Sequence, residues 1–325
     1  FLIDGNIILE PEGKNTGPAI LLAAFFAQGF TKNSSLIVAP SDHRISDSEL
    51  FHELVLKAIP DVENNQIVTF GIEPTFPSTG YGYLELGKKR INDSYRLIKF
   101  IENPSLEIAK NFFDSKNFLW NSGIFFLKSQ VVIDAFKTFC PEIYESVSAA
   151  FYRRYKDLDF WRVDEKYWNK SPSISIDYAI MEKAKNLIAV PFKSKWTDLG
   201  DWNAVWKELD PDEKGMVTMG DPVDIGCKNS LLRSEKKSQK LVGIGLENII
   251  AIAMPDAVLV ANKDRVQDVK YAMEELKKND VSQAFGFARD NRPWGWFETL
   301  LRGEGFQVNV WEGKALLLPA TRKYL

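Results

Sequence analysis

The first two hundred residues alternate between short apolar runs and amphipathic segments, and this alternation restricts the possible folds more than any other feature. The runs at 36–39, 66–72 and 187–192 have the length and composition of buried strands. Helix signals lie between them, such as Pro18 ahead of "AILLAAFFAQ" and a capping box formed by Ser46 and Glu49. This order is typical of an α/β fold with a doubly wound, mainly parallel, Rossmann-like sheet, which binds ligands beyond the carboxyl ends of its strands.

The pattern changes near residue 211 to short apolar runs separated by turns, and it closes with the helical segment "DVKYAMEELKK". We therefore expect a first domain at 1–210, a small β-rich domain at 211–280 that ends in a helix, and a linker with the start of a third β unit at 281–325. Strands such as "IIAIAM" need a covering surface, so we expect a homo-oligomer or domain packing. The chain begins without methionine and ends just after an apolar run, so we expect it to be part of a larger protein.

Charge and composition argue against several classes of partner. The chain has 44 acidic and 41 basic residues, with no basic block, so we expect neither a nucleic-acid nor an anionic-membrane partner. Its apolar runs are shorter than the roughly 18 residues that span a bilayer. Cys140 and Cys227 lie far apart and outside any CxxC spacing, which fits a reducing cytoplasm better than a disulfide framework or a zinc site.

Two aspartates follow predicted strands. Asp42 comes after the run "LIVAP", and Asp198 lies in "WTDLGDW" shortly after the strand at 187–192. Carboxylates at neighbouring strand ends can hold one Mg²⁺, a cation that typically links carboxylates to substrate phosphates. Each aspartate taken alone is equally well explained as the cap of a turn or helix.

Further polar positions lie in loops or at strand ends. The stretch "EPEGKNTGPAI" places Glu10, Asn15 and Thr16 before a helix amino end, which suits an anion or the edge of a base, although Thr16 as a helix N-cap explains it locally as well. The loop "STGYGYLELG" contains Gly82, "IENP" places Glu102 at a strand end, and "WNSG" contains Asn121. Taken alone, these three motifs are ordinary turns and a solvated charge.

Seven motifs in this order resemble those of the mannose-1-phosphate guanylyltransferases, also called GDP-mannose pyrophosphorylases. They are "EPEGKNTGPAI", "APSDH", "TGYGY", "FIENP", "LWNSGIFF", "SISIDYAIMEK" and "KWTDLGDW". The later stretches "NSLLRS", "DAVLVANKDRVQDVK" and "RPWGWFETLLRGEGFQV" resemble the long bacterial type, in which a cupin-like phosphomannose isomerase domain follows the nucleotidyltransferase domain.

The resemblance implies a role for each candidate. Asp42 and Asp198 would be the catalytic residues that bind Mg²⁺. Glu10, Asn15 and Thr16 would lie near the guanine, and Gly82, Glu102 and Asn121 would contact the mannose. The implied reaction joins GTP and mannose-1-phosphate to give GDP-mannose and pyrophosphate, and charge neutralisation and positioning should dominate its catalysis.

The sequence departs from the family pattern in three places. The glycine-rich loop that holds the triphosphate is absent, because the chain begins after it, and Asn103 follows Glu102 where the family usually has lysine. The histidines, His43 and His52, both precede the cupin-like region, so isomerase activity would depend on other residues. Two alternatives therefore stay open: a pyrophosphorylase for another nucleotide or hexose-1-phosphate, and a catalytically silent regulatory subunit that binds GDP-mannose.

Overall fold

The computed structural model describes residues 5–31, 34–90, 92–158, 160–235 and 239–284, and the backbone of 289–292, 295–303 and 306–313. The chain divides into two compact units, Phe1–Asp198 and Leu199–Leu325. The domain boundaries at 210 and 280 stay predictions. The α/β character of the first part and the β-rich character of the second are confirmed.

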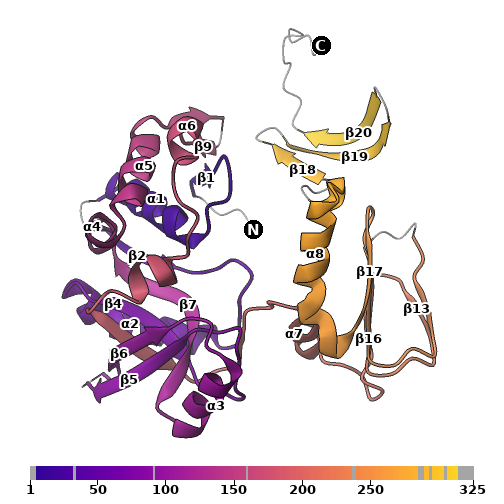
Figure 1. Cartoon of the computed structure of the whole chain (residues 1–325), viewed down its shortest axis with the longest axis horizontal. Helices are drawn as coiled ribbons and strands as arrows, with labels where there is room; N and C mark the ends of the chain where they lie inside the picture. The colour runs from indigo at the N-terminus through magenta and orange to yellow at the C-terminus, as the bar shows by residue number, and fades with distance from the viewer. Residues whose placement is uncertain are drawn as a thin grey trace. The chain divides into compact units, whose positions relative to one another are not determined.

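The first unit contains a central mixed sheet with helices on both faces (Figure 1). Its elements are, in chain order, β1 (Ile7–Leu9), α1 (Thr16–Gln28), β2 (Ser35–Val38), β3 (Arg44–Ile45), α2 (Ser48–Glu63), β4 (Ile67–Ile72), β5 (Tyr83–Lys89), β6 (Tyr95–Ile101), α3 (Leu106–Ser115), β7 (Phe118–Lys128), α4 (Ser129–Phe139), α5 (Pro141–Tyr152), β8 (Tyr155–Asp157), β9 (Phe160–Arg162), α6 (Glu165–Trp168), the π-helical turn η1 (Asp177–Met181), β10 (Leu187–Phe192) and β11 (Trp196–Thr197).

The six-stranded sheet has the order β2-β7-β4-β10-β6-β5, and β5 also pairs with the first part of β7. Among the described pairs of this sheet, β4 and β10 are parallel and the others are antiparallel. Four strands (β2, β4, β10 and β5) run in one direction, but they are interleaved with β7 and β6, which run in the other. The pairing of neighbours therefore differs from the mainly parallel sheet expected from the sequence.

The hairpin of β5 and β6 is the physical reason for one part of this difference, the direction of β6. The sequence predicts a glycine-containing loop at 78–87. In the structure Tyr83–Lys89 form the strand β5, which a short connection joins to β6. A connection of a few residues joins antiparallel strands, because a parallel pair needs a crossover of a dozen residues or more.

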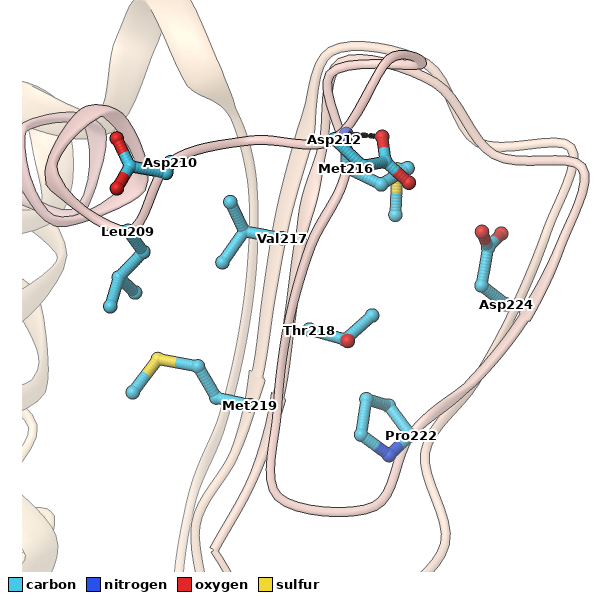
Figure 2. A pocket seen from close by; sticks show the side chains of 9 residues that line it. All are labelled: Leu209, Asp210, Asp212, Met216, Val217, Thr218, Met219, Pro222 and Asp224. Carbon is cyan, nitrogen blue, oxygen red and sulfur yellow. Dashed lines mark hydrogen bonds between the residues drawn. The ribbon is translucent and has the colours of Figure 1, made fainter.

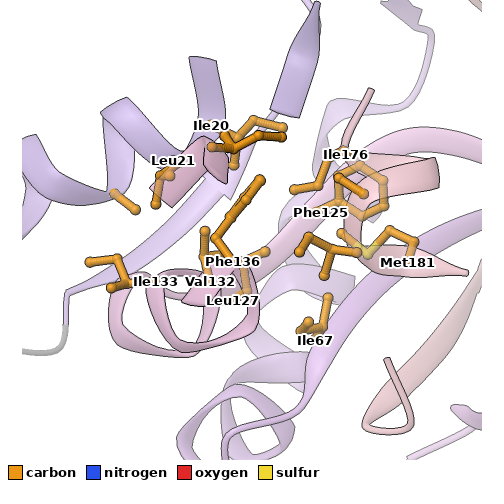
Figure 3. Packing of buried hydrophobic residues seen from close by; sticks show 14 of the residues in the cluster. Ile20, Leu21, Ile67, Phe125, Leu127, Val132, Ile133, Phe136, Ile176 and Met181 are labelled. Carbon is orange, nitrogen blue, oxygen red and sulfur yellow. The ribbon is translucent and has the colours of Figure 1, made fainter. Parts of the chain in front are cut away.

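The core lies on both faces of the sheet. Residues of odd number in the central strands, such as Phe125 and Leu127, face α1, α4 and η1, as Figure 3 shows for Ile20, Phe136 and Met181. Residues of even number, such as Val68, Phe70 and Phe126, pack on α2 through Val55, Ala58 and Val62. Because both faces are covered, all six residues of β4 are buried.

The helix starts differ in detail from the sequence prediction. Asp47 caps α2, since its Oδ1 accepts from Leu50 N at 2.9 Å, and the box of Ser46 and Glu49 is not the cap. Asn15 caps α1, where its Oδ1 accepts from Thr16 N at 2.8 Å. Several residue types cap helices almost equally well, so the flanking backbone decides which one does.

The second unit contains stacked parallel strands covered by helices. Its elements are α7 (Trp202–Glu208), β12 (Val217–Met219), β13 (Val223–Ile225), β14 (Leu231–Ser234), β15 (Val242–Ile244), β16 (Ile249–Ala253), β17 (Val258–Asn262), η2 (Lys263–Asp268), α8 (Val269–Lys278), η3 (Ser282–Ala284), β18 (Arg289–Arg292), β19 (Gly295–Gly303) and β20 (Phe306–Gly313). Strands β12, β14 and β16 are parallel, as are β13 and β15.

Apolar residues form ladders through these strands. Val217, Leu231 and Ile250 occupy one register position and pack against Trp202 and Trp206 of α7. The strand "IIAIA" therefore finds a covering surface within its own unit. Among the described residues, no helix combines the length and apolar character required to cross a membrane.

Substitution of Leu127 by alanine should lower the free energy of unfolding by about 2–5 kcal/mol, because this side chain is 0% exposed and its loss leaves a cavity in the core. Leu106→Ala is the matched control, because Leu106 is 52% exposed, and it should change the free energy by less than about 0.5 kcal/mol. Urea denaturation followed by circular dichroism measures both effects. Equal losses in the two variants would contradict this assignment of the core.

Candidate functional site

A hollow of about 320 Å³ in the first unit brings together most of the predicted residues. Thr16, Gly82, Glu102, Asn121 and Asp198 line it, whereas Glu10, Asn15 and Asp42 are outside its lining. The other lining residues are Ala19, Ile20, Val38, Ala39, Pro40, His43, Gly80, Tyr81, Ser122, Gly123, Phe125, Ile176, Asp177 and Trp196. The hollow thus lies where β2 ends and where the middle of β7 meets α1 and η1.

A small separate ladder brings both aspartates near His43. Their parent strands β2 and β10 are not neighbours, because β7 and β4 lie between them, which corrects the expectation of neighbouring strand ends. Instead β3 pairs antiparallel with β11, with Arg44 opposite Thr197. The next position in this register places His43 opposite Asp198, with Asp42 beside it.

The pKa of His43 is consistent with this arrangement. Burial lowers its pKa below the ordinary value, and the charges of Asp42 and Asp198 oppose that shift. Both carboxylates therefore act on one imidazole. His43 also packs edge-on against Trp196, with ring centroids 5.3 Å apart.

Aromatic side chains support Asp198. The Tyr81 hydroxyl donates to Asp198 Oδ1 at 3.2 Å. The Tyr81 ring contacts Trp120 and Trp196, at centroid distances of 4.9 Å and 5.5 Å. These contacts limit the positions open to the Asp198 carboxylate and explain part of the high aromatic content around "TGYGY" and "KWTD".

Glu102 and Gly82 are in direct contact. A Cβ atom on Gly82 would overlap Glu102 Oε2, so the absence of a side chain at this position is what admits the carboxyl group. Within the described part of the chain, Glu102 Oε2 is buried without a hydrogen-bond partner. Burial, followed by the charges of Asp177 and Glu182, raises the pKa of Glu102 to about 8.

Asn121 lies in an irregular part of β7. Between Thr69 and Gly71 the register with β4 shifts, so that Ser122, Gly123 and Ile124 on β7 correspond to Phe70 alone. Gly123 has φ +70°, a left-handed conformation that favours glycine, and Ser122 Oγ donates to Phe70 O at 2.6 Å. Irregularities of this kind redirect side chains and are common beside active sites.

Asp177 is a site residue that the sequence prediction missed. It begins η1, accepts from Asn121 Nδ2 at 3.1 Å and has its pKa raised by burial. The motif "SISIDYAIMEK" contributes to the resemblance, but the sequence assigns no role to a single residue within it. A carboxylate within a family-like motif was the available signal. Asp177 lies at the start of a π-helical turn, a conformation that is frequent at functional sites.

The amino end of α1 is anchored to the segment before η1. Ile176 N donates to Thr16 Oγ1 at 3.0 Å, and Gly17 N donates to Ile174 O at 3.0 Å. A Cβ on Gly17 would lie 2.6 Å from Ile174 O, so glycine is required for this approach. The Thr16 hydroxyl is thus used in a tertiary contact rather than as the N-cap.

The carboxylates of Asp42 and Asp198 suit a hard divalent cation such as Mg²⁺. Groups of three or more His, Cys, Asp or Glu arranged for a metal are absent from the described residues.

The second unit contains a separate hollow of about 550 Å³, with none of the predicted site residues in its lining (Figure 2). Two of its aspartates are engaged with the backbone of turns. Asp212 Oδ1 accepts from Met216 N at 2.8 Å and from Lys214 N at 2.9 Å, and Asp224 Oδ1 accepts from Cys227 N at 2.9 Å. The hydrogen bond from Cys227 N is the largest cause of the lowered pKa of Asp224. These carboxylates stabilise turns between the stacked strands.

Replacement of Glu102 by glutamine should stabilise the protein increasingly as the pH rises. Between the ordinary pKa of 4.5 and the folded-state value of about 8, the unfolded chain releases the Glu102 proton while the folded chain keeps it, so wild-type stability falls with pH. Glutamine does not titrate. Melting temperatures of both proteins from pH 5 to pH 9 measure the difference, with exposed Glu107→Gln as the control. A difference that stays constant over this range would contradict the raised pKa.

Comparison with known proteins agrees with the resemblance noted in the motifs. Residues 1–215 match the nucleotidyl transferase family, and residues 220–276 match the MannoseP isomerase/GMP-like beta-helix domain. The mannose-1-phosphate guanylyltransferase of Salmonella montevideo is 39% identical over 94% of this chain and 65% of its own length. The xanthan biosynthesis protein XanB of Xanthomonas campestris pv. campestris (strain B100) is 36% identical over 93% of this chain and 64% of its own length. The chain therefore spans less than two thirds of these relatives.

Solved structures give the same result. A structure described as mannose-1-phosphate geranyltransferase from Thermus thermophilus superposes with a TM-score of 0.71 at 28% identity, covering 83% of this chain and 77% of that one. A mannose-6-phosphate isomerase from Helicobacter pylori gives a TM-score of 0.54 at 32% identity over 59% of this chain and 73% of that one. Since the family match at residues 1–215 covers well over half of the sequence, the chain belongs to the nucleotidyl transferase family.

Proposed function

We propose that the full-length protein is a mannose-1-phosphate guanylyltransferase, which makes GDP-mannose and pyrophosphate from GTP and mannose-1-phosphate. The observation that carries the proposal is the hollow that unites the amino end of α1, the β3–β11 ladder and the Glu102–Asn121 corner. Curated relatives with this name support the choice of substrates.

Two groups of residues, in and beside the hollow, suit different parts of the substrates. Glu10 and Asn15 precede α1, and Thr16 begins it. We assign these residues to the neighbourhood of the guanine, because a carboxylate can accept hydrogen bonds from the N–H groups of the guanine ring. Gly82, Glu102 and Asn121 form the assigned mannose side, where carboxyl and amide groups suit hydroxyls. This division keeps the phosphate groups between the two sides and close to Asp198.

Nucleotidyl transferases of this family generally use a divalent metal. Here Mg²⁺ held by Asp42 and Asp198 would offset the negative charge of the phosphate groups. Tyr81 orients Asp198 through its hydroxyl, as described above.

The proposed step forms a bond between an oxygen of mannose-1-phosphate and the α-phosphorus of GTP, and it breaks the bond from that phosphorus to pyrophosphate. Positioning of two polyanions in line is the main task, so the side chains around the hollow act mainly by binding and orientation. We also propose a cytoplasmic homo-oligomer. Isomerase activity would belong to residues other than those of this hollow.

Asp42→Asn and Asp198→Asn should each lower pyrophosphate release by roughly a hundredfold or more, because each removes a negative charge from the proposed metal ligands. The measurement uses the full-length protein with Mg²⁺, GTP and mannose-1-phosphate. Asp114→Asn makes the same chemical change on the exposed surface of α3 and should leave the rate unchanged.

The same assay tests the alternatives. Release with another nucleotide or hexose-1-phosphate, but not with this pair, would show a pyrophosphorylase of different specificity. If the wild type released no pyrophosphate from any such pair, the guanylyltransferase proposal would be wrong and a silent GDP-mannose-binding subunit would take its place.

A further inference from the structure

The side-chain amide of Asn121 has a defined orientation. Its Oδ1 accepts from Thr69 Oγ1 at 3.1 Å and from Gly123 N at 3.2 Å, and its Nδ2 donates to Asp177 Oδ1 at 3.1 Å. Gly123 N can only donate, and an ionised Asp177 can only accept, so the oxygen and nitrogen cannot exchange places. One of the two Nδ2 hydrogens is used by Asp177, and the other is available to a ligand in the hollow that Asn121 lines.

The Glu102 carboxyl group next to it is in the opposite situation. Its Oε2 is buried against Gly82 and has no donor in the described part of the chain. The charged groups that act on it are Asp177 and Glu182, which come from η1 and the residue after it. It lies against Gly82, the residue before β5, and Asn121 of β7 lines the same hollow. The corner thus combines three acidic groups with one oriented N–H donor.

The acidic groups and the N–H donor of this corner distinguish the sugar ring of a sugar phosphate from its phosphate group. The acidic groups Asp177 and Glu182 disfavour a phosphate in this corner, whereas a carboxyl oxygen without a donor is a good acceptor for hydroxyls. Adjacent ring hydroxyls can donate to Glu102 and at the same time accept from Asn121 Nδ2. The ligand class that fits is a hexose with neighbouring hydroxyl groups, with its phosphate directed away from this corner.

We propose that Asp177 is a positioning residue of the hexose site: it orients the Asn121 amide, beside the Glu102 Oε2 atom whose missing donors the sugar hydroxyls supply. The proposal rests on the proposed function. On binding, the hydroxyls stabilise the Glu102 carboxylate, and its proton leaves to solvent. No other bond changes. Burial, followed by the charges of Asp177 and Glu182, raises the pKa of Glu102 to about 8, so the free protein mostly keeps this proton at pH 7.

Isothermal titration calorimetry of the full-length protein with mannose-1-phosphate, at pH 7 in two buffers of different ionisation enthalpy, measures the protons released. The wild type should release close to one proton more than Glu102→Gln. Protons that come from the sugar phosphate itself are common to both proteins and cancel in the difference. Exposed Asp114→Asn should match the wild type.

Two variants separate the two roles of Asp177. Asp177→Asn keeps an oxygen for Asn121 Nδ2 but removes the charge beside Glu102, so it should release fewer protons at pH 7 and bind the sugar phosphate at least as tightly. Asp177→Ala removes both and should raise Kd roughly tenfold, the effect of one lost hydrogen bond of average strength. Circular dichroism checks that each variant is folded.

The outcomes distinguish this inference from the proposed function. Equal proton release by the wild type and Glu102→Gln, or an unchanged Kd in folded Asp177→Ala, would overturn the role of Asp177, as would a wild type that fails to bind mannose-1-phosphate. Proton-linked binding without formation of GDP-mannose would support the role of Asp177 and reject the guanylyltransferase activity.

Discussion

Strand β7 forms hydrogen-bonded ladders with three strands, β2, β4 and β5. The geometry of the site depends on how the backbone of β7 pairs with all three. Its second half runs between β2 and β4, and its first half runs between β4 and β5. The change takes place at residues 121–124, where the register with β4 shifts and Gly123 adopts a left-handed conformation. This irregularity directs Asn121 to Asp177 and brings Gly82 of the β5 side within hydrogen-bond distance, since Asn121 N donates to Gly82 O at 2.7 Å.

The acidic residues in and beside the hollow have different surroundings. Asp42 is exposed, and Asp198 is half-buried beside a tyrosine hydroxyl. Glu102 and Asp177 line the hollow, and burial raises the pKa of both. Loss of solvent around these two carboxyl groups disfavours their charged form.

The second unit shows how a different periodicity leads to a different architecture. Short runs such as "LLRS" and "IIAIA" stack as parallel strands in register, and "IIAIA" also pairs antiparallel with β17. One face of the stack is covered by α7, η2 and the start of α8, with Trp202, Trp206, Val266 and Val269 in contact with the ladder of Val217, Leu231 and Ile250. The stack is therefore a core of its own.

Local sequence determined much of this protein. The periodicity of apolar residues predicted the strands at 36–39, 66–72 and 187–192 and the helix after Pro18, and the flanking runs placed Asp42, Asp198 and Glu102 after strands. These features depend on neighbours in the chain, so a sequence displays them directly. Asn121 was expected in a turn, whereas it lies within β7. Tertiary structure decided the strand order, the β3–β11 ladder that joins the two aspartates, the π-helical turn that carries Asp177, and the choice of Asn15 over Thr16 as the cap of α1. Each of these features depends on which distant segments pack together. Several local conformations have similar free energies, so packing of the core decides which of them forms.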